Sequence, residues 1–408
     1  MKQLSKMMLA AVASVCLAAP AFAWDFGASG TATANFNSTS TTAGTGANAV
    51  ASGGVSSAGS SLKLSSSNTD GAKTLGLSYT LDWDDNLDET ITLSGSSKVG
   101  DWTASGDVSY NRARLPGCYA TDNGTAASTA ATSCGTTGDA QGGEDSTSVT
   151  LTDGTMTIKL GDASHLSSQN VSSSGAAGGA ISFDSADDDA SVGAFVGSFH
   201  GVSLGYAISD AMSVTVAYQK SADTADMLGA GEAYDSEGTT YGTTGTGLGF
   251  SGTFGPATVG LTVASASTAD VGTPTVSPAS NSTAVSTTGL GVKLDLGDIK
   301  PFLSYGSYKA DGSVSLDGVS YSGNEIGTKY MLGTDSIVLY IGSYEEIITS
   351  GGTAGEALTK SGMELGYNTT VGPASLGIGY GSQTHAQTDG GTDGYVKTDI
   401  DVALGFSF

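Results

Sequence analysis

Carboxylates are the commonest charged side chains of this chain, and four of them gather in one long polar segment. The sequence has 40 acidic residues against 15 basic ones, a formal net charge of −25. Residues 164–198 contain Asp184 and the run Asp187, Asp188 and Asp189. A connection of this length is usually functional or disordered. Folded into a channel, its carboxylates would narrow the channel and favour cations. The alternative is a solvated outer loop with a harmless charge run.

Other residues offer little catalytic or metal-binding chemistry. The three histidines are scattered at positions 165, 200 and 385, and only His165 has a serine and an aspartate nearby in the sequence. We therefore predict no enzyme and no cofactor. A loop calcium ion is an alternative, because hard cations prefer carboxylate oxygens. The acidic residues that could hold it are Asp82, Asp84, Asp85, Asp88 and Glu89.

The amino terminus predicts export. Lys2 and Lys6 precede an apolar stretch from Met7 to Ala19, and Ala21-Phe22-Ala23 has the small-residue pattern of a cleavage site. We expect residues 1–23 to be a cleaved secretory signal peptide and residues 24–408 to form one domain. In an exported protein, the even pair Cys118 and Cys134 predicts a disulfide within one loop.

The last thirteen residues alternate between apolar and polar side chains up to the end of the chain. Ile400, Leu404 and Phe408 fall on one face of a strand, and Lys397, Asp399 and Asp401 fall on the other. At about 3.3 Å per residue and a tilt near 45°, such a strand rises roughly 30 Å, the thickness of a bilayer core. This pattern is typical of a strand that crosses a membrane.

The same alternation recurs along the chain, and short turns alternate with long polar loops. Asp153-Gly154, Gly255-Pro256 and Gly372-Pro373 are examples of the turns. We predict an all-β fold, a transmembrane antiparallel β-barrel of 16–18 strands with 18 favoured. Short turns would face the periplasm and long loops the cell exterior. The low charged fraction of 13% agrees, since a soluble domain usually carries about twice as much.

Alternation also predicts which charged residues line the inside of the barrel. Each lies between neighbours with outward apolar side chains. The predicted pore-wall residues are Lys63, Lys159, Lys293, Lys329, Asp82, Asp107, Asp295, Glu325 and Glu364. Acids on a loop that faced wall lysines would create a field across the pore, which orients dipolar solutes. The alternative is that these residues are merely hydrated.

Some outward residues predict contacts with the membrane surface. Arg112 and Arg114, the only arginines, share the parity of outward Val108 and Tyr110. They could bind lipopolysaccharide phosphates, because a planar guanidinium binds phosphate with two hydrogen bonds; the alternative is solvation at a frayed strand end. Tyrosines near strand ends indicate an interfacial girdle, with ordinary β propensity as the alternative. Those tyrosines are Tyr79, Tyr110, Tyr206, Tyr218, Tyr340 and Tyr380.

Signal peptide, alternating strands, acidic chain and terminal Phe408 together resemble the general diffusion porins of Gram-negative bacteria. Within them, Met156–Ala163 with the long Ser/Gly/Asp segment after it resembles the strand that enters the pore-constricting loop of alphaproteobacterial-type porins. The chain departs from that family's usual sixteen strands by an extra pair before Met156. The resemblance implies a homotrimer, water-filled pores, and recognition of the terminal strand, with Phe406 and Phe408, by the outer-membrane assembly machinery.

We therefore expect a passive channel of the bacterial outer membrane for ions and small hydrophilic solutes, with a preference for cations. Its partners would be the lipid bilayer and lipopolysaccharide, while so acidic a chain is a poor candidate for nucleic acid. A substrate-specific channel and a barrel that anchors adhesive or structural surface loops are the alternatives. Conductance of the purified protein in planar bilayers would separate the last from the two channels.

Overall fold

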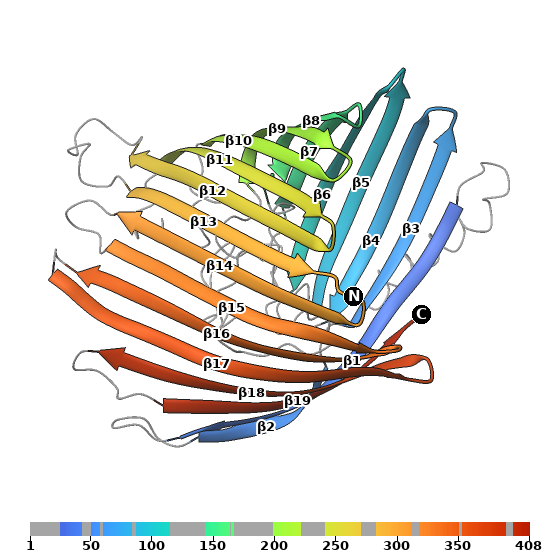
Figure 1. Cartoon of the computed structure of the whole chain (residues 1–408). Coiled ribbons are helices and arrows are strands. Elements are labelled where there is room, and N and C mark those ends of the chain that lie inside the picture. The colour runs from blue at the N-terminus through green and yellow to red at the C-terminus, as the bar shows by residue number, and fades with distance from the viewer. Residues whose placement is uncertain are drawn as a thin grey trace, which may run out of the picture. The chain divides into compact units, whose positions relative to one another are not determined.

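The computed structural model describes residues 25–42, 50–57, 60–83, 87–114, 143–163, 165–166, 199–221, 241–270, 283–311, 318–350, 353–388 and 395–408. These residues form strands and their turns (Figure 1). Among them, no helix is long and apolar enough to cross a membrane. The strands are β1 Asp25–Thr41, β2 Val50–Ser57, β3 Ser60–Asp70, β4 Lys73–Trp83, β5 Leu87–Val99, β6 Trp102–Arg114, β7 Gly143–Thr152, β8 Met156–Ala163, β9 Phe199–Ser209, β10 Met212–Ser221, β11 Tyr241–Phe254, β12 Ala257–Asp270, β13 Thr283–Leu294, β14 Ile299–Asp311, β15 Gly318–Leu332, β16 Asp335–Ser350, β17 Thr353–Val371, β18 Ala374–Thr388 and β19 Tyr395–Ser407.

All the strands belong to one antiparallel sheet, and its hydrogen-bond ladder is closed. β1 pairs with β3 and also with the last strand β19. The terminal residue takes part, because Gly30 N–H donates to Phe408 O at 2.8 Å and Phe408 N–H donates to Gly30 O at 3.0 Å. β2 and β3 follow one another with only residues 58–59 between them, and both pair with β1. Counted as one barrel strand, they give the closed 18-strand antiparallel β-barrel that the sequence favoured.

The chain divides into two compact units. The smaller comprises residues 1–33, 57–153 and 407–408, and the larger comprises residues 34–56 and 154–406. In the smaller unit, β3 to β7 pair each with the next. In the larger unit, β8 to β19 do the same, as the ordered ribbons from β9 to β19 show in Figure 1.

Short turns join alternate pairs of strands at one end of the sheet. Gly154 (φ 89°) and Gly372 (φ 62°) occupy the left-handed region in two of them, where a side chain would be strained. The turn positions predicted at Asp153-Gly154, Gly255-Pro256 and Gly372-Pro373 coincide with the observed strand ends. Tight turns of this kind fix the register of each hairpin.

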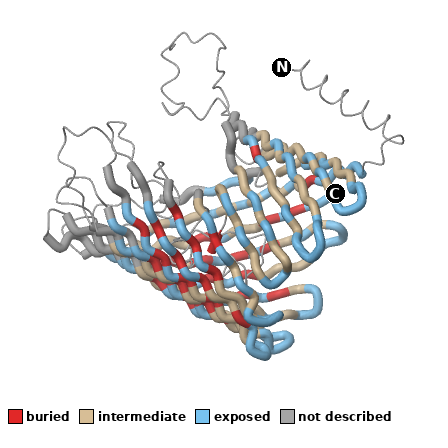
Figure 2. Tube along the Cα trace, turned by 90° about the horizontal axis from the view of Figure 1, so that it is seen from above, coloured by how far each residue is buried: buried red, intermediate tan, exposed pale blue. Residues whose placement is uncertain are grey.

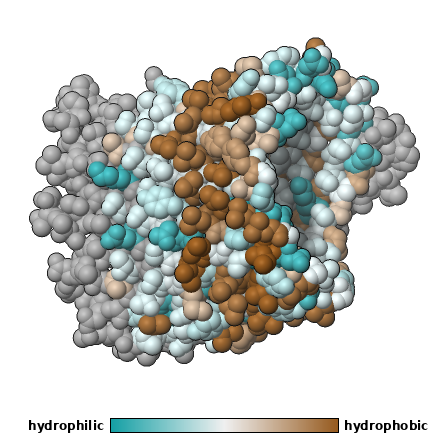
Figure 3. Space-filling view, in the orientation of Figure 1, coloured by the Kyte–Doolittle hydropathy of each residue, from teal (hydrophilic) through white to brown (hydrophobic). Residues whose placement is uncertain are grey.

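The two faces of the sheet differ in polarity, and buried positions alternate with exposed ones along the strands (Figure 2). Large apolar side chains on the outer face stay exposed, as with Leu93 at 49%, Leu204 at 45% and Leu404 at 49%. They gather in a band that crosses the strands of the larger unit (Figure 3). Exposed apolar surface on this scale indicates contact with lipid rather than with water.

The inner face of the larger unit has one aromatic cluster, formed by Phe302, Val338 and Tyr340. The rings of Phe302 and Tyr340 lie 6.1 Å apart and pack over Gly327. A Cβ at position 327 would lie 2.6 Å from both the Leu339 carbonyl oxygen and Phe302 Cζ. Only glycine fits there without displacing backbone.

We expect Gly327→Ala to lower the free energy of unfolding by roughly 1–3 kcal/mol, the usual cost of overpacking. Urea-induced unfolding in lipid vesicles, followed by tryptophan fluorescence, measures this change. Gly54→Ala is the matched control, because a Cβ at that strand glycine has no atom within 4 Å. Equal stability of the two variants would contradict the packing described here.

Candidate functional site

Three carboxylates lie on the inner face of alternate strands in the larger unit. Glu325 on β15, Glu364 on β17 and Asp399 on β19 are buried, with 0%, 1% and 5% of their surface exposed. Each is followed in sequence by an exposed outer residue, namely Ile326, Leu365 and Ile400. Strand alternation therefore directs all three to the polar face. We call them the wall carboxylates.

A hydrogen bond or an ion pair reaches one oxygen of each wall carboxylate and offsets part of the cost of burial. Ser304 Oγ donates to Glu325 Oε2 at 2.9 Å. The Tyr340 hydroxyl donates to Glu364 Oε2. Asp399 is held by Lys397, whose Nζ lies 3.6 Å from Asp399 Oδ2. The charge-bearing groups are thus fixed in position by neighbours on the same face.

The acidic surface continues on the inner face of β19 toward β1. Asn37 Nδ2 donates to Asp401 Oδ1 at 2.6 Å, which ties β1 to β19 near the start and end of the barrel ladder. Lys397, Asp399 and Asp401 all lie on this face, as the alternation of the terminal strand predicted. Carboxylates outnumber the one lysine here, so this part of the wall is negative.

The girdle prediction was wrong for Tyr340. Tyr110, Tyr206, Tyr218 and Tyr380 are between 39% and 49% exposed on the outer face, whereas Tyr340 is only 8% exposed. Its neighbours Leu339 and Ile341 face outward, so alternation already placed Tyr340 inside. The sequence reasoning missed Tyr340 as a partner of Glu364, although this parity was readable.

His165 and Leu166, which follow β8 in the sequence, are buried against another part of the inner face. His165 is 2% exposed and Leu166 is fully buried. The His165 ring bonds through Nδ1 to Ser203 Oγ at 2.8 Å and through Nε2 to Gly161 O at 3.1 Å. His165 is the histidine that has a serine and an aspartate nearby in the sequence. Its ring nitrogens link it to β8 and β9.

The other predicted wall residues follow the alternation of their strands. Lys159 pairs in register with Ser203, and Lys293 pairs with Phe302. Lys329 on β15 shares the parity of Glu325, and Lys63 on β3 lies opposite Ser29 and Thr80. Asp107 accepts a hydrogen bond from Ser148 Oγ at 2.7 Å, and Asp82 lies opposite Ser61. These positions are polar-face positions in both units.

Asp295 lies just beyond the end of its strand. β13 ends at Leu294, and Asp295 is an exposed residue that keeps the parity of Lys293, with its backbone N–H bonded to Pro256 O at 2.7 Å. Its carboxylate accepts hydrogen bonds from Lys300 Nζ at 3.0 Å and from Gly297 N–H at 3.1 Å. These two hydrogen bonds, the first larger, and the charge of Lys300 lower the pKa of Asp295. Its place on the pore wall remains a prediction.

Several predicted residues lie outside the described part of the chain. They are Asp184, Asp187, Asp188, Asp189, Cys118 and Cys134. Asp84 and Asp85 of the calcium alternative also lie outside it. Arg112 and Arg114 occupy the end of β6, in register with Glu89 and Leu87, but their side chains are not described. Their roles remain predictions.

The terminal aromatic residues lie on the outer face. Phe406 and Phe408 are 42% and 63% exposed. A Cβ at Gly30 would lie 2.5 Å from Phe408 Cζ, so this glycine makes room for the terminal ring. The backbone of Phe408 is therefore hydrogen-bonded to β1, and its ring packs against Gly30 of the same strand.

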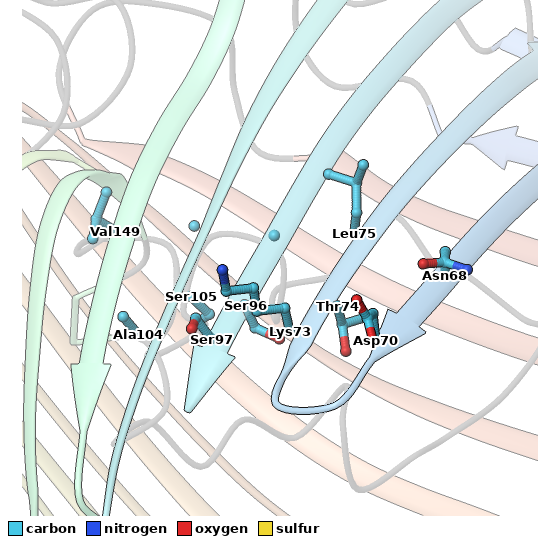
Figure 4. A pocket seen from close by; sticks show the side chains of 12 residues that line it. Asn68, Asp70, Lys73, Thr74, Leu75, Ser96, Ser97, Ala104, Ser105 and Val149 are labelled. Carbon is cyan, nitrogen blue, oxygen red and sulfur yellow. The ribbon is translucent and has the colours of Figure 1, made fainter. Parts of the chain in front are cut away.

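One hollow of about 490 Å³ lies in the smaller unit, near the β3–β4 turn (Figure 4). Its floor is made by small residues including Gly95, Ala104 and Gly106, between Leu75 and Val149. Leu75 and Val149 are exposed apolar residues of the outer face. The hollow therefore faces lipid and is not part of the polar inner face.

A closed β-barrel with an apolar exterior and a polar, charged interior defines the class of outer-membrane channel folds. No family model and no curated protein matches this sequence. Among solved structures, the chain is similar to the outer-membrane channel DcaP of Acinetobacter baumannii, with 13% identity, a TM-score of 0.54, and 94% and 97% of the two chains covered. It is also similar to a loop-deletion mutant of OmpT, an outer-membrane protein of Vibrio cholerae, with 11% identity, a TM-score of 0.50, and 95% and 100% covered. At such identities the likeness establishes the fold alone, which is that of porin-like outer-membrane channels.

Proposed function

We propose that this protein is a passive channel of the bacterial outer membrane that conducts ions and small hydrophilic solutes and prefers cations. The observation that carries the proposal is the row of wall carboxylates, Glu325, Glu364 and Asp399, on the inner face of the larger unit. Lipid outside and carboxylates inside are the arrangement that a cation-conducting barrel needs. Export through a cleaved signal peptide and recognition of Phe406 and Phe408 by the assembly machinery belong to the same proposal.

The preference for cations follows from electrostatics. At 10 Å, one carboxylate attracts a monovalent cation by about 1.7 kcal/mol at an effective dielectric constant near 20. Salt near 0.1 M screens such fields over roughly 10 Å. Charges fixed in the wall therefore act on an ion in the channel, whereas charges on distant loops act weakly. An acidic wall would raise the cation concentration along the path.

We further propose that residues 164–198 form the constriction and that Asp184, Asp187, Asp188 and Asp189 face the passing ions. Support comes from the first described residues of this segment, because His165 and Leu166 are buried against inner-face residues of β9 and β11. A segment that starts on the inner wall can reach the lumen directly. The wall lysines would then face loop acids across the pore.

We expect purified protein in planar bilayers to give discrete conductance steps and a cation-selective reversal potential in a potassium chloride gradient. Asp187→Asn, Asp188→Asn and Asp189→Asn together should lower this selectivity, because three charges leave the narrowest part of the path. Unchanged selectivity in the triple variant would remove the constriction assignment. A complete lack of steps in the wild type would remove the channel and favour a barrel that anchors surface loops.

The remaining contacts are proposed from the amino-acid sequence alone. Arg112 and Arg114 would bind lipopolysaccharide phosphates, Cys118 and Cys134 would form a disulfide, and the barrels would assemble as a homotrimer. None of these contacts is needed for the ion preference proposed above.

A further inference from the structure

We infer that His165 and Leu166 are positioning residues that dock the chain across the inner wall, with Leu166 seated in a slot that Gly247 opens. The functional consequence rests on the channel proposed above, while the docking itself rests on contacts among described residues of the larger unit. The two can therefore be tested separately.

The slot belongs to a row of inner-face residues that crosses five neighbouring strands. In register, Lys159 pairs with Ser203, Ser203 with Ala217, Ala217 with Gly247, and Gly247 with Ala264. The residues that β10, β11 and β12 contribute to this row are Ala, Gly and Ala, so their side chains leave space above the inner face of the sheet. Ala217 and Ala264 are nevertheless 1% and 4% exposed.

The consecutive residues His165 and Leu166 contact two different strands of this row. His165 bonds to Ser203 on β9, and Leu166 packs at Gly247 on β11. Neighbouring strands are about 4.8 Å apart, so the chain at this point runs across the strands and not along them.

Gly247 is required for the seat. A Cβ at this position would overlap Leu166 Cδ1 and would lie 3.6 Å from Leu166 Cγ and 3.5 Å from Ala264 Cβ. Leu166 is fully buried, and burying a leucine side chain contributes roughly 1.5–3 kcal/mol relative to exposure. Burial of the apolar Leu166 side chain on an otherwise polar face thus docks this part of the chain on the sheet.

His165 makes the second contact between this segment and the inner face. A carbonyl oxygen only accepts hydrogen bonds, so Nε2 donates to Gly161 O, while Nδ1 bonds to the Ser203 hydroxyl, a group that can donate or accept. Gly161 has a φ of 111° within β8, a conformation that favours glycine. The imidazole therefore links His165 to both β8 and β9.

Crosslinking tests the seat without any need for conduction. In a chain with Cys118→Ser and Cys134→Ser, Leu166→Cys with Gly247→Cys should form a disulfide on mild oxidation of the folded protein, detected by mass spectrometry of peptides before and after reduction. Gly205→Cys is the matched control partner, because the atoms within 4 Å of a Cβ there come from Thr215 and Thr157 and not from Leu166. No bond to position 247, or an equal yield at position 205, would overturn the seat.

Conductance tests the positioning role. The oxidised double variant, with its disulfide between positions 166 and 247, should keep the single-channel conductance and selectivity of the wild type, because the bond preserves the observed geometry. Gly247→Leu, which fills the slot, and Leu166→Ala, which empties it, should both change these properties. If both variants conduct like the wild type while the disulfide forms, the seat exists but does not position the channel, and that part of the inference is overturned.

Discussion

Replacement of the wall carboxylates, by Glu325→Gln, Glu364→Gln and Asp399→Asn, is expected to move the reversal potential in a salt gradient strongly toward zero. A perfectly cation-selective pore gives about 59 mV for a tenfold gradient of a monovalent salt. The wild type should lie on the cation-selective side, and the triple variant should lose most of that potential. The change removes three negative charges from one inner face, together with the ion pair between Lys397 and Asp399.

The amide side chains should leave the fold intact. The amide oxygens introduced at positions 325 and 364 can accept the hydrogen bonds that Ser304 and Tyr340 donate to the native carboxylates. Asp101→Asn, Asp210→Asn and Asp298→Asn form the matched control, since these exposed residues lie in short turns and their loss changes the net charge equally. A triple turn variant that reduced selectivity as much as the wall variant would show that overall charge, not the wall, sets the preference.

Arginine at Leu93 is expected to destabilise the barrel by roughly 2–4 kcal/mol, the cost of a cation on the lipid face near the midplane. Leu93 is at the centre of β5 and 49% exposed on the outer face. Arginine at the next residue, Ser94, should change stability by only about 0.5 kcal/mol or less, as expected for a solvated surface position. Ser94 pairs in register with Asp107 on the inner face, where a cation can be hydrated and can meet a carboxylate.

The comparison separates the effect of the sheet face from other effects of an arginine, because the two substituted positions are adjacent in the same strand and point to opposite faces. Unfolding in urea from lipid vesicles gives both free energies, and heat-dependent migration in gels gives an independent readout. A soluble protein with an aqueous outer face would lose little stability from Leu93→Arg. Equal destabilisation by the two substitutions would therefore contradict both the register and the membrane assignment.

Local alternation predicted most of the architecture. The period-two pattern of Val396–Phe408 placed Ile400 and Leu404 outside and Lys397, Asp399 and Asp401 inside, as the structure has them. Turn dipeptides such as Asp153-Gly154 placed hairpin ends correctly. These features depend on neighbours within a few residues, so they are readable in one sequence. The predicted range of 16–18 strands reflected the apparent extra pair before Met156, and the structure has 18 when β2 and β3 are counted as one interrupted strand.

Residues at strand ends were less predictable. Asp295 follows the parity of Lys293, but its strand ends at Leu294, and the sequence did not show that its carboxylate bonds to Lys300 on the next strand. Tyr340 was assigned by residue type to the girdle, whereas its parity and packing on Phe302 place it inside. Parity was the stronger signal there, since a strand cannot turn one residue outward without a bulge.

The sequence by itself determined the class of fold and the two faces of most strands, because strand periodicity is a local property. Only the tertiary structure decided which inner side chains meet. Asn37 and Asp401 are 364 residues apart in sequence and join where the ladder closes. His165 meets Ser203, and Leu166 meets Gly247, because strand register brings a row of small residues under the chain that follows β8. Such contacts depend on pairing between distant strands, which no local pattern records.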